Sequence, residues 1–270
     1  MITINDEDFT AFAEFINSNF GINLLYKKSF VQGRLQVLLE DKGFKSFFDY
    51  FNYVLNDTTK SEITELINRI TTNYTFFMRE EEHFSYLVNK VLPYLKKNIK
   101  DNDLRTWSAG CSTGEEPYTI AMLLLEYFGP EISSWNTKIL ATDISVKALN
   151  IAKKGVYFPN SLDNLSGVWK LKYFTKNPEG NYCIAKELKD EVIFRVFNLV
   201  DEIYPFKKKF HIIFCRNVMI YFDNKTRKKL IDKLYDSLEP GGFLFIGHSE
   251  IINRSESKFK NVIPSVYKKE

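Results

Sequence analysis

The feature that most constrains the fold is a regular alternation of apolar, strand-like segments with helical segments after about residue 100. The strand-like segments are LRTWSAG, KILATDIS, EVIFRVFNL and FHIIFCRN. Strands that alternate with helices favour parallel pairing, because a parallel connection needs a crossover that a helix supplies. We therefore predict a mainly parallel, doubly wound α/β sheet with helices on both faces.

The two ends of the chain depart from this alternation. Up to about Asn73 the apolar residues recur at helical spacing, which predicts a small all-helical domain over residues 1–75. A linker helix is expected over residues 76–97. At the other end, EPGGFLFIGHSE and NVIPSVYKK have no strong helix between them, so we expect an antiparallel hairpin at the edge of the sheet.

The remaining residues, 98–270, are assigned to the sheet domain. Within them, residues 155–189 combine glycine, proline, asparagine and aromatic residues without a long helical period, which predicts a small β insertion. A chain of 270 residues that is 44% hydrophobic is long enough to bury one large core and one small one.

The composition excludes several classes of function. The formal net charge of +3 is too small for the dense Lys/Arg surface that non-specific nucleic-acid binding needs, so no nucleic acid is expected as a partner. The three cysteines lack metal-ligand spacing and the three histidines are scattered, so we expect reduced thiols and no metal. The acidic N-terminus and the short apolar runs predict no signal peptide and no membrane insertion, hence a cytoplasmic protein.

The loop after the first predicted strand carries Gly110 and Gly114, followed at once by Glu115 and Glu116. Glycine loops that open a helix usually bind phosphate, because backbone N–H groups and the helix dipole favour negative charge. Two carboxylates repel a pyrophosphate, and the third glycine of G-x-G-x-x-G is missing. A cationic ligand fits better, and S-adenosylmethionine carries an ammonium and a sulfonium but no phosphate.

Further candidates lie at the carboxyl ends of the other predicted strands, where doubly wound sheets bind ligands. Asp143 ends the second strand, and its carboxylate suits the two hydroxyls of a ribose. Asn198 ends the third strand and suits the edge of an adenine. Arg216 and Asn217 end the fourth. An acidic loop, a second-strand acid and two polar strand ends, in this order, together favour a cofactor site.

Each candidate also has a purely structural interpretation. Glu115 and Glu116 are suited to complement the dipole of their own helix. Asp143 and Asn217 are suited to cap the segments that follow them, and Asn198 to be an ordinary polar strand end. No single residue separates the two interpretations.

Six segments of the chain occur in a characteristic order between about residues 10 and 265: TTNYTFFMRE, WSAGCSTGEEPY, ATDIS, FNL, IIFCRNVMIYF and LEPGGFLFIGHSE. In sequence and order they resemble the chemotaxis receptor methyltransferases of the CheR family. The resemblance implies a class I S-adenosylmethionine-dependent methyltransferase with a Rossmann-like sheet. It also implies methyl transfer from S-adenosylmethionine to glutamate side chains of chemoreceptors in chemotactic adaptation, with S-adenosylhomocysteine as the second product.

The same resemblance implies roles for individual residues. Arg79 and Tyr221 match the family's proposed catalytic positions. The positions that match its cofactor-binding residues are Asn73, Thr75, Arg79, Glu115, Asp143, Asn198, Leu199, Arg216 and Asn217.

The implied chemistry needs few catalytic groups. A free glutamate side chain has a pKa of about 4.3, so the acceptor is ionised at neutral pH without a strong base. Arg79 suits a carboxylate of the substrate or of the cofactor, and the hydroxyl of Tyr221 suits the attacking oxygen. The alternatives are a surface ion pair for Arg79 and a core aromatic role for Tyr221.

The expected partner is the cytoplasmic domain of a methyl-accepting chemoreceptor, which the protein meets as a monomer. A basic face on the helical domain is a candidate for that contact, with a solvated surface as the alternative. Its residues are Lys27, Lys28, Arg34, Lys42 and Lys45.

Two functions of other kinds are weighed against this one. A methyltransferase of the same fold acting on a nucleic-acid base typically carries a D/N-P-P-Y loop, and RNVMIY lacks both prolines. A non-catalytic module that binds a receptor and senses S-adenosylmethionine keeps the same cofactor residues. Methylation of another substrate by the same fold is the third alternative.

Overall fold

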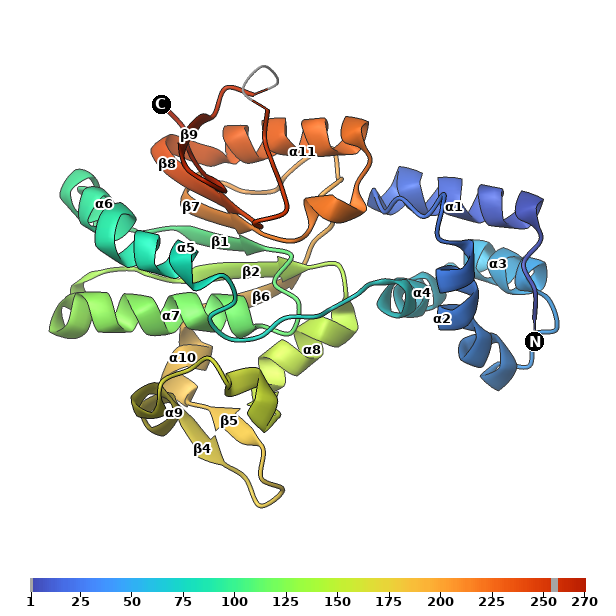
Figure 1. Ribbon diagram of the computed structural model, residues 1–270, viewed down its shortest axis with the longest axis horizontal. Coiled ribbons are helices and arrows are strands. Elements are labelled where there is room, and N and C mark those ends of the chain that lie inside the picture. The colour runs from blue at the N-terminus through green and yellow to red at the C-terminus, as the bar shows by residue number, and fades with distance from the viewer. Residues whose placement is uncertain (1, 254–256) are drawn as a thin grey trace.

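The computed structural model describes residues 2–253 and 257–270. The N-terminal part is a unit of four helices with its own apolar core, in which Phe12 packs edge-on against Phe47 and Phe51 with ring centroids 5.1 and 5.5 Å apart. Its helices are α1 (Asp6–Phe20), α2 (Lys28–Asp41), α3 (Phe47–Asn56) and α4 (Ser61–Ile70). In Figure 1 this unit stands beside the sheet, joined to it by an extended segment.

The end of α1 requires glycine at position 21. Gly21 has a φ of 73°, and a Cβ there would lie 2.6 Å from Cγ1 of Val200 in the sheet domain. Only glycine combines this left-handed conformation with so close an approach. The helix therefore stops where the two parts of the chain touch.

The linker begins later than predicted, because residues 71–80 are not helical. The helix that follows consists of α5 (Glu81–Tyr86), the π-helical turn η1 (Leu87–Val91) and α6 (Leu92–Asn98). In the turn, the N–H of Leu92 bonds to the carbonyl of Leu87, five residues back. Pro93 follows directly and has no N–H to donate.

A seven-stranded sheet forms the main body, in the order β6-β2-β1-β7-β8-β10-β9. The first five strands in this order pair in parallel, which confirms the predicted parallel sheet. The strands are β1 (Thr106–Ala109), β2 (Ile139–Asp143), β6 (Val192–Val196), β7 (Phe210–Cys215), β8 (Leu238–Ile246), β9 (Lys260–Ile263) and β10 (Val266–Lys268).

Helices cover both faces of this sheet, as Figure 1 shows. One face packs against α5, α6, α7 (Glu115–Phe128) and α8 (Val146–Lys154), and the other against α11 (Asn224–Ser237). Two short 3-10 helices, η2 (Gly129–Ser134) and η4 (Met219–Tyr221), complete the connections. Among the described residues, no helix combines the length and apolarity that crossing a bilayer requires.

The antiparallel edge is present, and it contains one strand more than expected. We expected EPGGFLFIGHSE and NVIPSVYKK to be the two arms of a hairpin. β8 from the first segment also continues the parallel part beside β7, and the second segment forms two strands, β9 and β10, around Ser265, whose φ is 62°. The apolar run of β8 is buried on both faces, which favours an interior position. β10 then pairs antiparallel with β8.

The predicted β insertion is a small antiparallel sheet in the order β3-β5-β4, at the bottom of Figure 1. The elements between α8 and β6 are β3 (Val156–Tyr157), η3 (Pro159–Leu162), α9 (Gly167–Tyr173), β4 (Phe174–Lys176), β5 (Tyr182–Ile184) and α10 (Lys186–Glu191). The separate core of the helical unit supports the division that we propose into domains 1–75 and 98–270.

Candidate active site

The carboxyl ends of β6, β2, β1 and β7 surround one cavity of about 320 Å³. Its wall also includes residues of the helical unit and of the extended segment 71–80. This volume lies in the range of small-molecule sites, and the position is the one expected for a doubly wound sheet. The predicted site residues that line it are Asn73, Thr75, Arg79, Asp143, Asn198, Leu199, Arg216, Asn217 and Tyr221.

The glycine loop approaches the next strand connection closely. Gly110 has a φ of 84°, and a Cβ there would lie 2.4 Å from Cγ2 of Val218. The loop therefore needs glycine for its conformation and for space. Next to it, Cys111 is buried and lines the cavity, but burial raises the pKa of its thiol well above the ordinary value, so it is no thiolate nucleophile.

Asp143 stands at the end of β2 with both carboxylate oxygens engaged. Oδ2 accepts a hydrogen bond of 2.8 Å from the N–H of Ser112, and Oδ1 accepts one of 2.8 Å from the N–H of Ser145. Burial raises the pKa of Asp143 although these N–H groups act in the opposite direction. The helix cap of α8 is Ser145, whose hydroxyl accepts from the N–H of Ala148, so Asp143 is not the cap.

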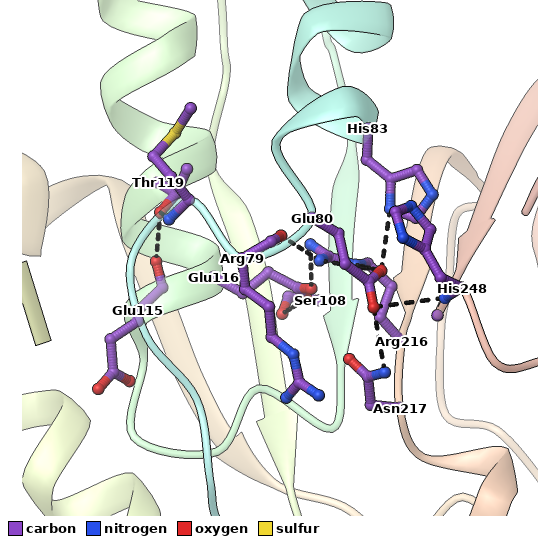
Figure 2. Close-up of polar contacts among 12 residues, drawn as sticks. Arg79, Glu80, His83, Ser108, Glu115, Glu116, Thr119, Arg216, Asn217 and His248 are labelled. Carbon is purple, nitrogen blue, oxygen red and sulfur yellow. Dashed lines mark hydrogen bonds and ion pairs between the residues drawn. The ribbon is translucent and has the colours of Figure 1, made fainter. Parts of the chain in front are cut away.

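The two neighbouring glutamates of the glycine loop point in different directions. Glu115 is buried, accepts a 2.6 Å hydrogen bond from the hydroxyl of Thr113, and does not line the cavity. Glu116 does line it and accepts a 2.7 Å hydrogen bond from the hydroxyl of Ser108. Figure 2 shows the two side chains diverging. The cavity thus supports Glu116, rather than the Glu115 that the resemblance implied, as the acid that faces a ligand.

Arg216 is buried and forms ion pairs with two carboxylates. Its guanidinium lies 3.2 Å from a carboxylate oxygen of Glu80 and 3.2 Å from one of Glu116, and it donates to the carbonyl of Arg79. Burial opposes ionisation of Glu80, but the charge of Arg216 and the amide of Asn217 outweigh it and lower the pKa of Glu80. Arg216 thereby joins the end of β7, the start of α7 and the extended segment.

Arg79 differs from Arg216 because it forms no salt bridge among the described residues. Its guanidinium donates a 2.9 Å hydrogen bond to the carbonyl of Tyr74 and lies 5.9 Å from the centre of that ring. In the described part of the chain it forms no ion pair with a carboxylate, so the predicted alternative of a surface ion pair, with one of the glutamates at positions 80–82, is wrong. Figure 2 shows its side chain extending away from the Glu80 carboxylate.

Tyr221 and Asn198 lie where the helical unit meets the sheet. The carbonyl of Tyr221 accepts a 2.8 Å hydrogen bond from the N–H of Asn23, and Lys27 lies 5.6 Å from the centre of its ring. Tyr221 lines the cavity and is half-buried, so it is not a core aromatic. The amide of Asn198 donates a 2.8 Å hydrogen bond to the carbonyl of Asn19 in α1.

The extended segment is tied to the loops that end β1 and β2. The carbonyl of Asn73 accepts a 3.1 Å hydrogen bond from the hydroxyl of Ser112, and its amide lies 3.5 Å from the hydroxyl of Ser145. Thr75 lines the same wall, and Leu199 adds a buried apolar side chain.

Backbone strain is concentrated around the cavity. Four residues other than glycine have a left-handed conformation there: Met78, Glu80, Ser112 and Asn217, with φ of 60°, 59°, 49° and 57°. Such residues persist where surrounding contacts hold them, and they cluster at functional sites. At Asn217, the N–H donates to Glu250 and the side-chain amide to Glu80, so the side chain is not a helix cap.

The lining fits S-adenosylmethionine. The carboxylates of Glu116 and Asp143 suit its positive charges and its ribose, and the apolar side chains of Ile144, Phe197 and Leu199 suit a flat adenine ring. The acid at the end of β2 is in the position where dinucleotide-binding folds hold a ribose.

The order of the sheet then defines the class of protein. If its strands are numbered along the chain within this sheet alone, the order is 3-2-1-4-5-7-6, with an antiparallel seventh strand. This arrangement, with the cavity at the carboxyl ends of its central strands, is that of a class I S-adenosylmethionine-dependent methyltransferase. The chain belongs to the CheR methyltransferase family: the all-alpha domain of that family matches residues 7–71, and its SAM-binding domain matches residues 73–267.

Relatives of nearly full length agree with this assignment. The chain is 44% identical over 272 residues to a chemotaxis protein methyltransferase of Borreliella burgdorferi, covering 99% of this chain and 96% of the relative. It is 35% identical over 262 residues to the chemotaxis protein methyltransferase of Escherichia coli, covering 96% and 89%. The protein is therefore a methyltransferase of chemotaxis with S-adenosylmethionine as its cofactor.

Two acidic residues of the site, Glu80 and Glu250, were not among the residues predicted to act there, and Glu116 was predicted only together with Glu115, as part of an acidic loop. Glu80 and Glu116 hold Arg216, and the buried Glu250 accepts from the N–H groups of Asn217, Met219 and Gly247 at 3.0, 2.7 and 2.6 Å. All three lie in segments that the resemblance rested on, namely TTNYTFFMRE, GEEPY and GHSE. Their position in the sequence next to predicted site residues indicated that they lie near the site. Their ion-pair and hydrogen-bond partners could not be predicted from the sequence.

Proposed function

We propose that the protein transfers the methyl group of S-adenosylmethionine to glutamate side chains of chemoreceptors, giving glutamate methyl esters. The observation that carries this proposal is the guanidinium of Arg79, which forms no salt bridge among the described residues and lines the same cavity as Tyr221. A positive charge without a carboxylate partner favours an anionic acceptor and disfavours a protonated amine. Relatives of nearly full length that are named chemotaxis protein methyltransferases add support.

Bound S-adenosylmethionine supplies an electrophilic methyl group on a positively charged sulfur. The chain's own residues bind the cofactor and the acceptor carboxylate and orient them toward each other. In this proposal the Arg79 guanidinium holds a carboxylate in the cavity, and the Tyr221 hydroxyl donates to the attacking oxygen. Charge is neutralised as a carboxylate meets a sulfonium, so a pocket that excludes water favours the reaction more than a general base does.

Arg216 has a positioning role in this scheme. It is paired with Glu80 and Glu116 and donates to the carbonyl of Arg79, so its charge is already used. This network holds the backbone of Arg79 at the wall of the cavity. We also propose that the partners are receptor cytoplasmic domains and that the protein acts on them in the cytoplasm as a monomer.

The test is the chemical nature of the transferred methyl group. The protein is incubated with S-adenosylmethionine labelled in its methyl group and with membranes that contain a chemoreceptor. A methyl ester releases the label as volatile methanol under mild alkali, whereas N-methyl and C-methyl products keep it. We expect alkali-labile label on the receptor.

Receptor variants provide the matched control. Replacing the acceptor glutamates by alanine should abolish the label, and replacing glutamates elsewhere in the cytoplasmic domain should leave it unchanged. Alkali-stable label contradicts the glutamate acceptor while leaving the cofactor site intact. Cofactor binding without any transferred label contradicts the receptor as substrate.

A further inference from the structure

A cluster of potential metal ligands lies behind the cavity, among residues that the proposed reaction does not use directly. Glu80 precedes α5, His83 lies in α5, and His248 follows β8. One side-chain ligand atom from each lies within 4.8 Å of the other two. Figure 2 shows the two imidazole rings side by side next to the Glu80 carboxylate. Residues 168 positions apart in the chain thus meet at one point.

His83 is the least satisfied member of the cluster. Its ring is 1% exposed, and neither ring nitrogen has a hydrogen-bond partner among residues 2–253 and 257–270. Nδ1 lies 3.4 Å from a carboxylate oxygen of Glu80 but without hydrogen-bond geometry. Buried polar groups almost always have partners, so the two ring nitrogens of His83 are available to a ligand. A ring nitrogen aimed at a carboxylate and a second imidazole is suited to a cation.

The types of donor narrow the class of cation. Two imidazole nitrogens and one carboxylate oxygen are the ligands of open zinc sites of the His₂Glu type. Imidazole also suits copper and nickel, whereas magnesium and calcium prefer oxygen ligands. This set of donors therefore favours borderline divalent cations.

The surrounding charges allow a cation to bind. Arg216 lies 3.2 Å from Glu80, but Glu116 lies equally close to Arg216, so two carboxylates share this guanidinium. Carboxylates that ligate zinc are often held from behind by a hydrogen-bond donor, and Arg216 and Asn217 are placed to do this for Glu80.

The geometry requires a small closure. Ligand atoms of a tetrahedral zinc site are about 3.3 Å apart, given bonds of about 2.0 Å, so separations of up to 4.8 Å are too long for a closed site. His248 is exposed and its ring is not held by a hydrogen bond among the described residues. Its side chain is therefore free to move inward toward Glu80 and His83.

We propose that Glu80, His83 and His248 form a binding site for Zn²⁺ or a similar borderline divalent cation, with a fourth position open to water. The site adjoins the cavity, because Glu80 also holds Arg216 and Asn217, both of which line it.

The test uses the full chain, stripped of metal by a chelator. Calorimetric titration with Zn²⁺ should give one site per chain. Titration with Co²⁺ should give visible d–d absorption without the charge-transfer bands that a cysteine ligand produces. His248→Ala removes an exposed ligand and should weaken Zn²⁺ binding at least tenfold without affecting folding.

The chain offers matched controls, since its third histidine and its half-buried cysteine lie outside the cluster. His211→Gln and Cys183→Ser should bind Zn²⁺ as tightly as the wild type does. Absence of stoichiometric binding to the wild type, or unchanged binding by His248→Ala, overturns the proposal. Loss of binding in either control variant also overturns it, because it places the metal elsewhere.

Discussion

At the scale of single residues, the site separates binding from positioning. Asp143, Arg79 and Tyr221 face the cavity with groups that a ligand is able to reach, whereas Glu80 and Arg216 are satisfied by each other. Substitutions of the first kind should change one step of the reaction. Substitutions of the second kind should disturb the whole wall, because they leave a buried charge unpaired.

Asp143→Ala should weaken the binding of S-adenosylmethionine. A charge-assisted hydrogen bond contributes about 1.5–3 kcal/mol, so affinity should fall by about ten- to a hundredfold for each ribose bond lost. Asp143→Asn keeps one acceptor and should lose less. Calorimetry with S-adenosylhomocysteine measures both, and thermal unfolding verifies the fold. An unchanged dissociation constant in a folded Asp143→Ala protein would mean that this residue only supports the loop through Ser112 and Ser145.

Tyr221→Phe should lower the turnover rate by about tenfold and leave cofactor affinity nearly unchanged, because it removes one orienting hydrogen bond and keeps the ring. Receptor methylation at saturating cofactor and receptor measures the rate. The matched control is Tyr53→Phe, which removes a hydroxyl from a ring that is 48% exposed in the helical unit. Equal turnover in all three proteins would remove Tyr221 from the catalytic scheme.

At the scale of elements, the end of the sheet opposite the cavity carries a polar cluster of its own. His211 in β7 accepts a 3.1 Å hydrogen bond at Nδ1 from the N–H of Arg105, just before β1. The guanidinium of Arg105 pairs with Asp103 and with Glu239 in β8. Burial, together with the charge of Arg105, lowers the pKa of His211 to about 4, although Glu239, Asp101 and Asp103 oppose the shift.

The lowered pKa of His211 predicts that the folded protein loses unfolding free energy in acid. In the unfolded chain His211 has a pKa of about 6.5. Between this pH and about 4, the unfolded state binds a proton at His211 and the folded state does not. The contribution to stability is therefore complete above about pH 6.5 and is lost as the pH falls toward 4. Urea unfolding at about pH 7.5 and about pH 5 should show that His211→Gln loses less unfolding free energy than the wild type does, by about 1–2 kcal/mol after solvent screening. Parallel losses in both proteins would show that His211 is not responsible.

At the scale of the whole molecule, the helical unit completes the cavity. The N–H of Asn23 bonds to the carbonyl of Tyr221, Asn17 bonds to Asp223, and the amide of Asn198 reaches Asn19. Part of the basic face on this unit already forms ion pairs with carboxylates of the same unit. Lys42 pairs with Glu62 at 2.7 Å and Lys28 with Asp6. In the part of the chain that the structure describes, Lys27, Arg34 and Lys45 have no such carboxylate partner.

Arg34→Glu should therefore weaken receptor methylation, by a few-fold to about tenfold at low salt and much less at high salt, because exposed charges are screened within about 10 Å at 0.1 M ionic strength. Cofactor affinity should not change. Lys207→Glu makes the same charge change on the exposed loop before β7 and serves as the control. A loss of activity that does not depend on salt would indicate damage to the helical unit instead of lost attraction.

The sequence alone determined the parallel sheet, the β insertion, the nature of the cofactor and the polar strand ends that line its cavity. These depend on local signals: apolar periodicity, glycine loops and the polar residues that end strands. The resemblance to the CheR family, rather than a local pattern, supplied Asn73, Thr75, Arg79, Leu199 and Tyr221 of the cavity wall. Tertiary structure decided which of two neighbouring glutamates faces the cavity. Glu115 and Glu116 are indistinguishable in the sequence, yet only Glu116 faces the cavity, because successive helical residues point about 100° apart.

Only tertiary structure paired Arg216 with Glu80, 136 positions away, and brought His83 next to His248. The division of NVIPSVYKK between two strands, β9 and β10, is likewise visible only in the folded chain. Such contacts join segments whose separation along the chain carries no periodicity. They follow from how the apolar faces pack, and a local pattern does not contain that information.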